Sequence, residues 1–129
     1  MIQKRIMVVD DDKDFLNELQ ETLAMSGYEI IAIHNSKNAA NVAAVSKPDV
    51  IILDLKMDGM DGFELAQALK HSPQTNDIPL IAMTGYFTSQ EHSELITKCG
   101  MKACLKKPFN PLDLISHIEN ALLDGDIPE

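Results

Sequence analysis

Five short apolar runs, separated by segments with helical spacing, constrain the fold of this chain more than any other feature. Short apolar runs bounded by turn residues are typical of strands buried on both faces of a sheet. Strands that alternate with helices form a parallel sheet, and right-handed crossovers place helices on both of its faces. We therefore predict an α/β fold with a doubly wound, five-stranded parallel sheet, whose strands are residues 4–9, 28–33, 50–53, 78–83 and 102–105.

The segments after these runs carry the start and stop signals of five helices. Asp12 and Ser36 are the candidate N-caps of the first two helices, and Gly27 stops the first of them. The fourth helix opens with a capping box at Thr88 and ends before Gly100. The residues predicted to face the core are Phe15, Leu16, Leu19 and Leu23 in the first helix and Leu112, Ile115, Ile118 and Leu122 in the last.

Length and composition indicate one globular domain. We place it at residues 1–123 of the 129, followed by a polar tail at 124–129. A formal net charge of −9 argues against a protein that binds nucleic acid or a membrane surface directly. No apolar run reaches membrane-spanning length and no leader pattern is visible, so we expect a cytoplasmic protein. Cys99 and Cys104 are too few for a disulfide framework or a zinc site, and we expect both to be reduced.

Polar residues of different kinds stand where four of the predicted strands end, in chain order Asp10 with Asp11, Asp54, Thr84 and Lys107. The carboxyl ends of parallel strands meet at one edge of the sheet, which is where open α/β sheets bind ligands. Each residue also has an ordinary explanation, as an acidic turn, a strand-end threonine or a surface lysine. Because all of these explanations would have to hold together, we favour a shared site.

The residue types at this edge predict a phosphoryl-transfer site with Mg²⁺. Three carboxylates held together repel one another without a cation, and hard oxygen ligands suit Mg²⁺. An aspartate accepts a phosphoryl group when a metal and a cation neutralise the phosphoryl oxygens during transfer. Lys107 supplies an ammonium and Thr84 a hydroxyl donor, so we expect the phosphoryl group on Asp54.

The motifs at these strand ends resemble those of response-regulator receiver domains, the CheY-like domains of two-component signalling. The four motifs are Val-Val-Asp-Asp-Asp at 8–12, Asp-x-x-Met-x-Gly-Met-Asp-Gly at 54–62, Met-Thr-Gly at 83–85 and Lys-Lys-Pro-Phe at 106–109. They occur in order and span nearly the whole chain. The expected strand order, 2-1-3-4-5, is borrowed from the known flavodoxin-like and CheY-like folds.

By this resemblance, Asp54 accepts a phosphoryl group from a phosphohistidine on a sensor histidine kinase or a histidine phosphotransfer protein. Such a chain promotes only its own phosphorylation and dephosphorylation and is not an enzyme with a separate substrate. The resemblance also implies that Mg²⁺ is bound by Asp10, Asp11, Asp54 and the backbone carbonyl of Lys56. The peptide bond before Pro108 is expected to be cis, a state accessible essentially only before proline.

The resemblance further implies that Thr84 and Lys107 contact the phosphoryl oxygens. Lys56 and Tyr86 are expected to flank the path of water to the acyl phosphate and so to tune its lifetime. Cys104 occupies the position where many receivers carry a tyrosine or phenylalanine that moves with the threonine. A thiol cannot fill the volume of an aromatic ring, so the usual aromatic switch is missing.

Several functions stay open at this point. A downstream protein partner is expected on the face formed by the helix at 88–99 and the last strand and helix, with no direct contact to nucleic acid or membrane. Cys104 leaves room for a phosphorelay intermediate or phosphate sink without a large conformational output. A Mg²⁺-dependent phosphohydrolase is a weaker alternative, because such enzymes place a second aspartate where this chain has Lys56. A receiver that only binds and is never phosphorylated is the remaining possibility.

Overall fold

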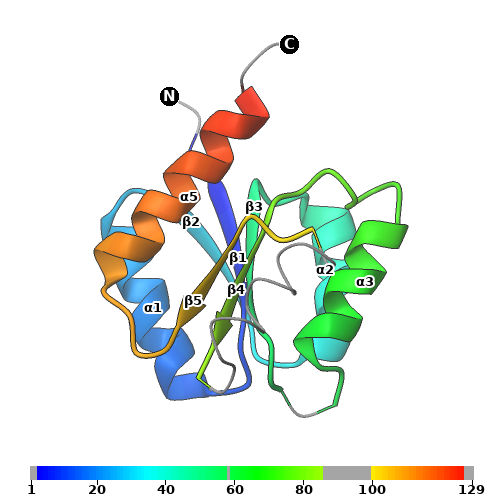
Figure 1. The fold of residues 1–129 in the computed structure, drawn as a ribbon, viewed down its shortest axis with the longest axis horizontal. Coiled ribbons are helices and arrows are strands. Elements are labelled where there is room, and N and C mark those ends of the chain that lie inside the picture. The colour runs from blue at the N-terminus through cyan, green and yellow to red at the C-terminus, as the bar shows by residue number, and fades with distance from the viewer. Residues whose placement is uncertain (1–2, 58, 86–99, 127–129) are drawn as a thin grey trace.

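The computed structural model describes residues 3–57, 59–85 and 100–126, and it confirms the predicted parallel sheet (Figure 1). All four strand pairings are parallel, and the order is β2-β1-β3-β4-β5. The strands are β1 (Arg5–Val9), β2 (Glu29–Ile33), β3 (Val50–Asp54), β4 (Leu80–Thr84) and β5 (Ala103–Lys106). The described helices are α1 (Lys13–Met25), α2 (Ser36–Ser46), α3 (Gly62–His71) and α5 (Pro111–Asp126). The predicted helix at 88–99 lies outside the described residues.

Helices cover both faces of the sheet, with α1 and α5 on one side and α2 and α3 on the other (Figure 1). Every residue of β3 and β4 is buried, which explains why these runs are apolar without alternation. Successive residues of a strand point to opposite faces, and this divides the core in two. Ile6, Val8, Ile52 and Met83 pack with α1 and α5, whereas Met7, Ile51, Leu53 and Ala82 pack with α2 and α3.

The start of α1 agrees with the sequence prediction, and the start of α2 corrects it. Asp12 caps α1, because its side chain accepts hydrogen bonds from the backbone N–H groups of Asp14 and Phe15. Asn35, not Ser36, caps α2: Asn35 has an extended backbone and its side chain accepts from the N–H of Lys37. The Ser36 hydroxyl instead donates to the carbonyl of Met60 at 2.6 Å, which ties α2 to the loop before α3.

The inward face predicted for α5 is partly wrong. Leu112 is 68% exposed, whereas the buried stripe is Leu114, Ile118 and Ala121. Leu112 precedes Leu114 by two positions, which is about 200° around a helix of 3.6 residues per turn. Leu112 and Leu114 both fit a helical spacing of apolar residues. Packing against the sheet buries Leu114 and leaves Leu112 exposed. The helix runs to Asp126, into the segment 124–129 that we assigned to a polar tail.

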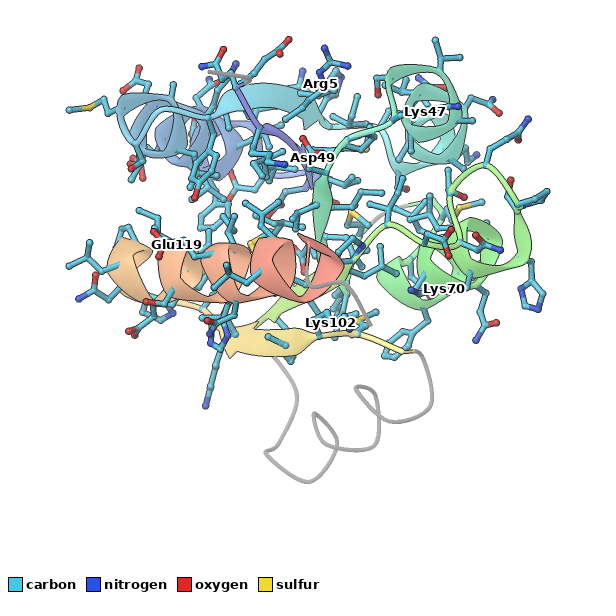
Figure 2. The ribbon with its side chains drawn as sticks, turned by 90° about the horizontal axis from the view of Figure 1, so that it is seen from above. Arg5, Lys47, Asp49, Lys70, Lys102 and Glu119 are labelled. Carbon is cyan, nitrogen blue, oxygen red and sulfur yellow. The ribbon has the colours of Figure 1, made fainter. Side chains whose placement is uncertain are left out.

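Polar contacts of Arg5 fix the amino ends of β1 and β3, on the side of the molecule opposite the carboxyl ends of the strands (Figure 2). The backbone N–H of Arg5 donates to the Asp49 carboxylate at 2.8 Å, and the Arg5 guanidinium donates to the carbonyl of Ser46 at 2.6 Å. These contacts hold the start of β1 against the loop that enters β3. Within the described part of the chain, no helix is long and apolar enough to cross a membrane.

Candidate functional site

Asp10 and Asp54 are held by the same local structure at the ends of two adjacent strands. Asp10 directly follows β1 and Asp54 is the last residue of β3, whose residue Leu53 lies beside Val9. The backbone N–H of Asp12 donates to Oδ1 of Asp10 at 3.0 Å. In the same way, the N–H of Lys56 donates to Oδ1 of Asp54 at 3.1 Å. Each carboxylate is therefore fixed by the turn that follows it.

Lys107 brings these two carboxylates together. Its Nζ lies 2.6 Å from Oδ2 of Asp10 and 3.1 Å from Oδ2 of Asp54. The backbone N–H of Lys107 donates to the carbonyl of Thr84 at 2.7 Å, so the lysine is anchored to the end of β4. The Lys107 ammonium is a cation that offsets part of the repulsion between these carboxylates before any metal binds.

The electrostatics of the pair are dominated by the burial of Asp10, whose side chain is fully buried. Burial raises the pKa of Asp10, and the hydrogen bond from Lys107 only partly opposes this, so the pKa lies above its ordinary value. Burial by itself lowers the pKa of Lys107, but the hydrogen bond and charge of Asp10 and the charge of Asp54 outweigh it and raise that pKa. One ammonium thus leaves the Asp10 charge incompletely compensated, and the site favours further positive charge.

The geometry fits a divalent metal with oxygen ligands. One carboxylate oxygen from each of Asp10, Asp11 and Asp54 lies within 4.8 Å of the others. The site opens into a pocket of about 430 Å³ that is lined by Asp10, Asp11, Asp12, Asp54, Lys56, Gly85 and Lys107. Mg²⁺ prefers hard oxygen ligands, and these carboxylate oxygens are ligands of that kind. The charge of Asp10, which Lys107 neutralises only in part, adds to the attraction for a cation.

Three further predicted site residues are Lys56, Thr84 and Tyr86. Lys56 is exposed and lines the pocket. Thr84 is fully buried at the end of β4 and is not among the residues that line the pocket. Tyr86 lies outside the described residues. The Lys107–Pro108 peptide bond is cis, as expected.

Cys104 lies in β5 and packs, partly buried, against the core between the sheet and the α2 and α3 helices. Burial raises the pKa of its thiol from 9.0 to about 11.

Because only the thiolate reacts, we expect Cys104, in a Cys99→Ser background at pH 8, to be alkylated about a hundredfold more slowly than in the same protein unfolded in urea. Equal rates in the folded and unfolded chains would contradict this. The folded state should also lose stability as the pH rises from 9.0 towards 11, where only the unfolded thiol ionises.

Two residues that matter at the site were not identified from the sequence. Phe15 was assigned to the core, yet Nζ of Lys107 lies 4.0 Å from the centroid of its ring. Gly62 stands in the sequence only as the last residue of the motif at 54–62, yet a Cβ there would meet the backbone carbonyl of Asp54 and lie 2.6 Å from Cα of Leu55. An aromatic residue in the first turn after the acidic motif was the available signal for Phe15, and the position of Gly62 in the motif at 54–62 was the signal for the glycine.

Comparisons with known proteins show which family this chain belongs to. A family model described as the response regulator receiver domain matches residues 6–119. The phosphate regulon transcriptional regulatory protein PhoB of Pseudomonas aeruginosa is 33% identical over 123 residues, which are 95% of this chain and 53% of PhoB. The polar-differentiation response regulator DivK of Brucella anthropi is 30% identical over 122 residues, which are 95% of this chain and 98% of DivK. The chain thus spans about half of the first relative and nearly all of the second.

Solved structures give the same result. The crystal structure of a response regulator from Desulfuromonas acetoxidans has a TM-score of 0.85 at 33% identity, covering 93% of this chain and 97% of that one. The chemotaxis response regulator CheY4 of Vibrio cholerae has a TM-score of 0.85 at 28% identity, covering 94% of this chain and all of that one. With its parallel sheet, its acidic edge and a family match over 6–119, this chain belongs to the response regulator receiver domains of two-component systems.

Proposed function

We propose that Asp54 accepts a phosphoryl group from a phosphohistidine of a sensor histidine kinase or histidine phosphotransfer protein, in a Mg²⁺-dependent reaction that changes affinity for a downstream partner. The observation that carries the proposal is the convergence on one pocket of a nucleophile, a cation and a ligand set. Lys107 bridges Asp10 and Asp54 there, and an oxygen of Asp11 lies within 4.8 Å of theirs. Receiver domains as a family interact with histidine kinases and with downstream effectors and are regulatory rather than enzymes.

The residues proposed to hold Mg²⁺ are Asp10, Asp11, Asp54 and the backbone carbonyl of Lys56. An acidic pocket that typically binds Mg²⁺ is a property of the family, and the carboxylate oxygens of this chain fit it. When bound, Mg²⁺ supplies positive charge that neutralises phosphoryl oxygens during transfer.

The residues of the chain orient the Asp54 nucleophile and contact the negatively charged phosphoryl oxygens. A carboxylate oxygen of Asp54 attacks phosphorus, the bond from phosphorus to the histidine nitrogen breaks, and the imidazole leaves as the acyl phosphate forms. The N–H of Lys56 and the ammonium of Lys107 fix the orientation of the Asp54 carboxylate before attack. Lys107 and Thr84 are proposed to contact the phosphoryl oxygens. For Thr84 this requires its buried side chain to turn towards the pocket.

We place the downstream partner on the face that includes β5 and α5, together with the predicted helix at 88–99 outside the described residues. Two large apolar side chains of α5 are exposed, Leu112 at 68% and Leu123 at 59%. They are separated by about three turns of helix and so lie on one side of it. Exposed apolar residues on one helix side suit a protein partner better than nucleic acid.

A phosphorelay intermediate or phosphate sink is the second candidate, and Cys104 favours it. In β5 this residue presents a half-buried thiol where an aromatic ring would move. Partner capture with and without an acyl-phosphate mimic separates the two functions. Strong dependence on the mimic supports the partner-binding receiver, and equal capture in both conditions supports the relay or sink.

The main test is incubation with a phosphohistidine donor protein, or with acetyl phosphate, in Mg²⁺ or in EDTA. We expect one phosphoryl group per chain in Mg²⁺ and almost none in EDTA, measured by intact-protein mass spectrometry. Sustained hydrolysis of a chromogenic phosphate ester would instead favour a phosphohydrolase. Labelling that is equal with and without Mg²⁺ would contradict the proposed ligand set.

A further inference from the structure

The ammonium of Lys107 has a third contact that its role as a bridge between carboxylates does not explain. Its Nζ lies over the face of the Phe15 ring, 4.0 Å from the ring centroid. A ring face carries negative partial charge, and a cation within about 6 Å of the centroid is attracted to it. The lysine side chain is 21% exposed, so the ring shields one side of the ammonium from water.

The Phe15 ring is itself held in place from two directions. Its backbone N–H donates to the Asp12 side chain at 3.2 Å, which fixes Phe15 in the first turn of α1. Its ring meets the ring of Phe109 nearly at right angles, at 84° and 6.0 Å between centroids. Because Phe109 follows Lys107 by two residues, the segment that carries the ammonium also carries the residue that orients the ring.

The ring and the carboxylates restrain the ammonium in different ways. The bonds to Asp10 and Asp54 are directional, and they must loosen when the ammonium turns to a phosphoryl oxygen. A ring face attracts a cation without a fixed donor direction, so the ammonium can rotate and keep this contact. A lysine side chain otherwise has considerable rotamer freedom to lose when it is fixed at a site.

We propose that Phe15 is a positioning residue for phosphoryl transfer, whose ring holds the Lys107 ammonium over the pocket while its hydrogen bonds pass from carboxylates to the phosphoryl group. This inference rests on the proposed phosphorylation of Asp54. It assigns to one aromatic side chain of α1 a role in the rate of transfer, separate from its packing in the core.

The test replaces Phe15 by phenylalanine carrying one, two or three ring fluorines, which weakens the negative ring face at nearly constant size. The rate of labelling by acetyl phosphate at saturating Mg²⁺ should fall stepwise, to about one fifth with three fluorines, as expected for loss of a partly exposed cation–π contact. Phe15→Tyr should stay within about twofold of the wild type, and Phe15→Leu should resemble the trifluorinated protein.

A second readout needs neither metal nor phosphodonor. In the metal-free wild type, the Lys107 methylene protons next to Nζ should show upfield NMR shifts from the ring below them. These shifts should disappear in Phe15→Leu and persist in Phe15→Tyr. The Mg²⁺ dissociation constant should be unchanged throughout the series, which separates positioning of the ammonium from damage to the metal ligands.

Phe63 provides the control, since it lies in α3 and packs against the core cluster on the other face of the sheet. The same fluorine series at Phe63 should leave the labelling rate within about twofold. A flat Phe15 series in a protein that is labelled on Asp54 would overturn the inference, as would an equal fall in both series. Failure of the wild type to be labelled would instead overturn the proposed function.

Discussion

Replacing Lys107 by methionine is expected to lower the free energy of unfolding of the metal-free protein by about 3 kcal/mol. Methionine has a similar length and no charge, so the change leaves two carboxylates without their common partner. The Asp10 side chain is fully buried and that of Asp54 is 11% exposed, so water from the pocket can replace the lost ammonium only in part. Urea denaturation in EDTA measures the effect directly.

Addition of Mg²⁺ should restore much of this lost stability, because a cation that binds only the folded state stabilises it by mass action. Lys106→Met is the matched control: the neighbouring Lys106 is exposed, and its loss should change stability by less than about 0.5 kcal/mol. If Lys107→Met were as stable as Lys106→Met in EDTA, the carboxylates would not depend on the lysine.

Gly62→Ala is expected to destabilise the protein by about 3 kcal/mol, at the upper end of the range for overpacking a core. Gly62 is the first residue of α3, and its N–H donates to the carbonyl of Leu55 at 3.0 Å. An added Cβ would meet the carbonyl oxygen of Asp54 and Cα of Leu55, both of which are backbone atoms that cannot rotate away. Either α3 leaves the end of β3 or the peptide that carries Asp54 shifts.

If the peptide that carries Asp54 shifts, the substitution affects the site, because a displaced Asp54 should be labelled more slowly. Labelling and stability should then fall together. Gly85→Ala serves as the control for stability, because a Cβ at Gly85 meets no atom within 4 Å. The urea midpoint of Gly62→Ala should lie about 1–3 M below that of Gly85→Ala, because a loss of about 3 kcal/mol is divided by an m-value of about 1–3 kcal/mol/M. Equal midpoints would show that α3 adjusts without cost.

The fold was predictable because its signals are local and repeated. Apolar runs that end on polar residues gave the strands, and the carboxyl ends of parallel strands lie at one edge whatever the detailed packing. That rule predicts that Asp10, Asp54 and Lys107 meet, and the structure places Nζ of Lys107 within 3.1 Å of both carboxylates. The N-cap of α1 at Asp12 was predictable for the same local reason.

The errors arose where two neighbouring residues satisfied the same local rule. Asn35 and Ser36 are both good N-caps, and the carbonyl of Met60, far away in sequence, engages the Ser36 hydroxyl. Leu112 and Leu114 both fit a helical stripe, and only packing against the sheet chooses Leu114. Local propensity cannot settle such pairs, because the deciding contact comes from another element.

The roles of Phe15 and Gly62 depend on approach distances that no spacing rule contains. Phe15 fits a core position at helical spacing, and nothing in the sequence says that a lysine 92 positions later lies over its ring. Gly62 fits a turn, and its closeness to the backbone of Asp54 follows from how α3 packs on β3. Thr84 shows the same limit, since the strand end was predicted but its complete burial was not.

The most direct test of the account is to locate the phosphoryl group after labelling by acetyl phosphate in Mg²⁺. We expect the wild type to gain one phosphoryl group, mapped by peptide mass spectrometry to Asp54, and Asp54→Asn to gain none. The Asn variant keeps the shape of the side chain, so its loss of labelling reports the nucleophile and not the fold. Stoichiometric labelling of Asp54→Asn, or a wild-type label mapped to another residue, would contradict the account.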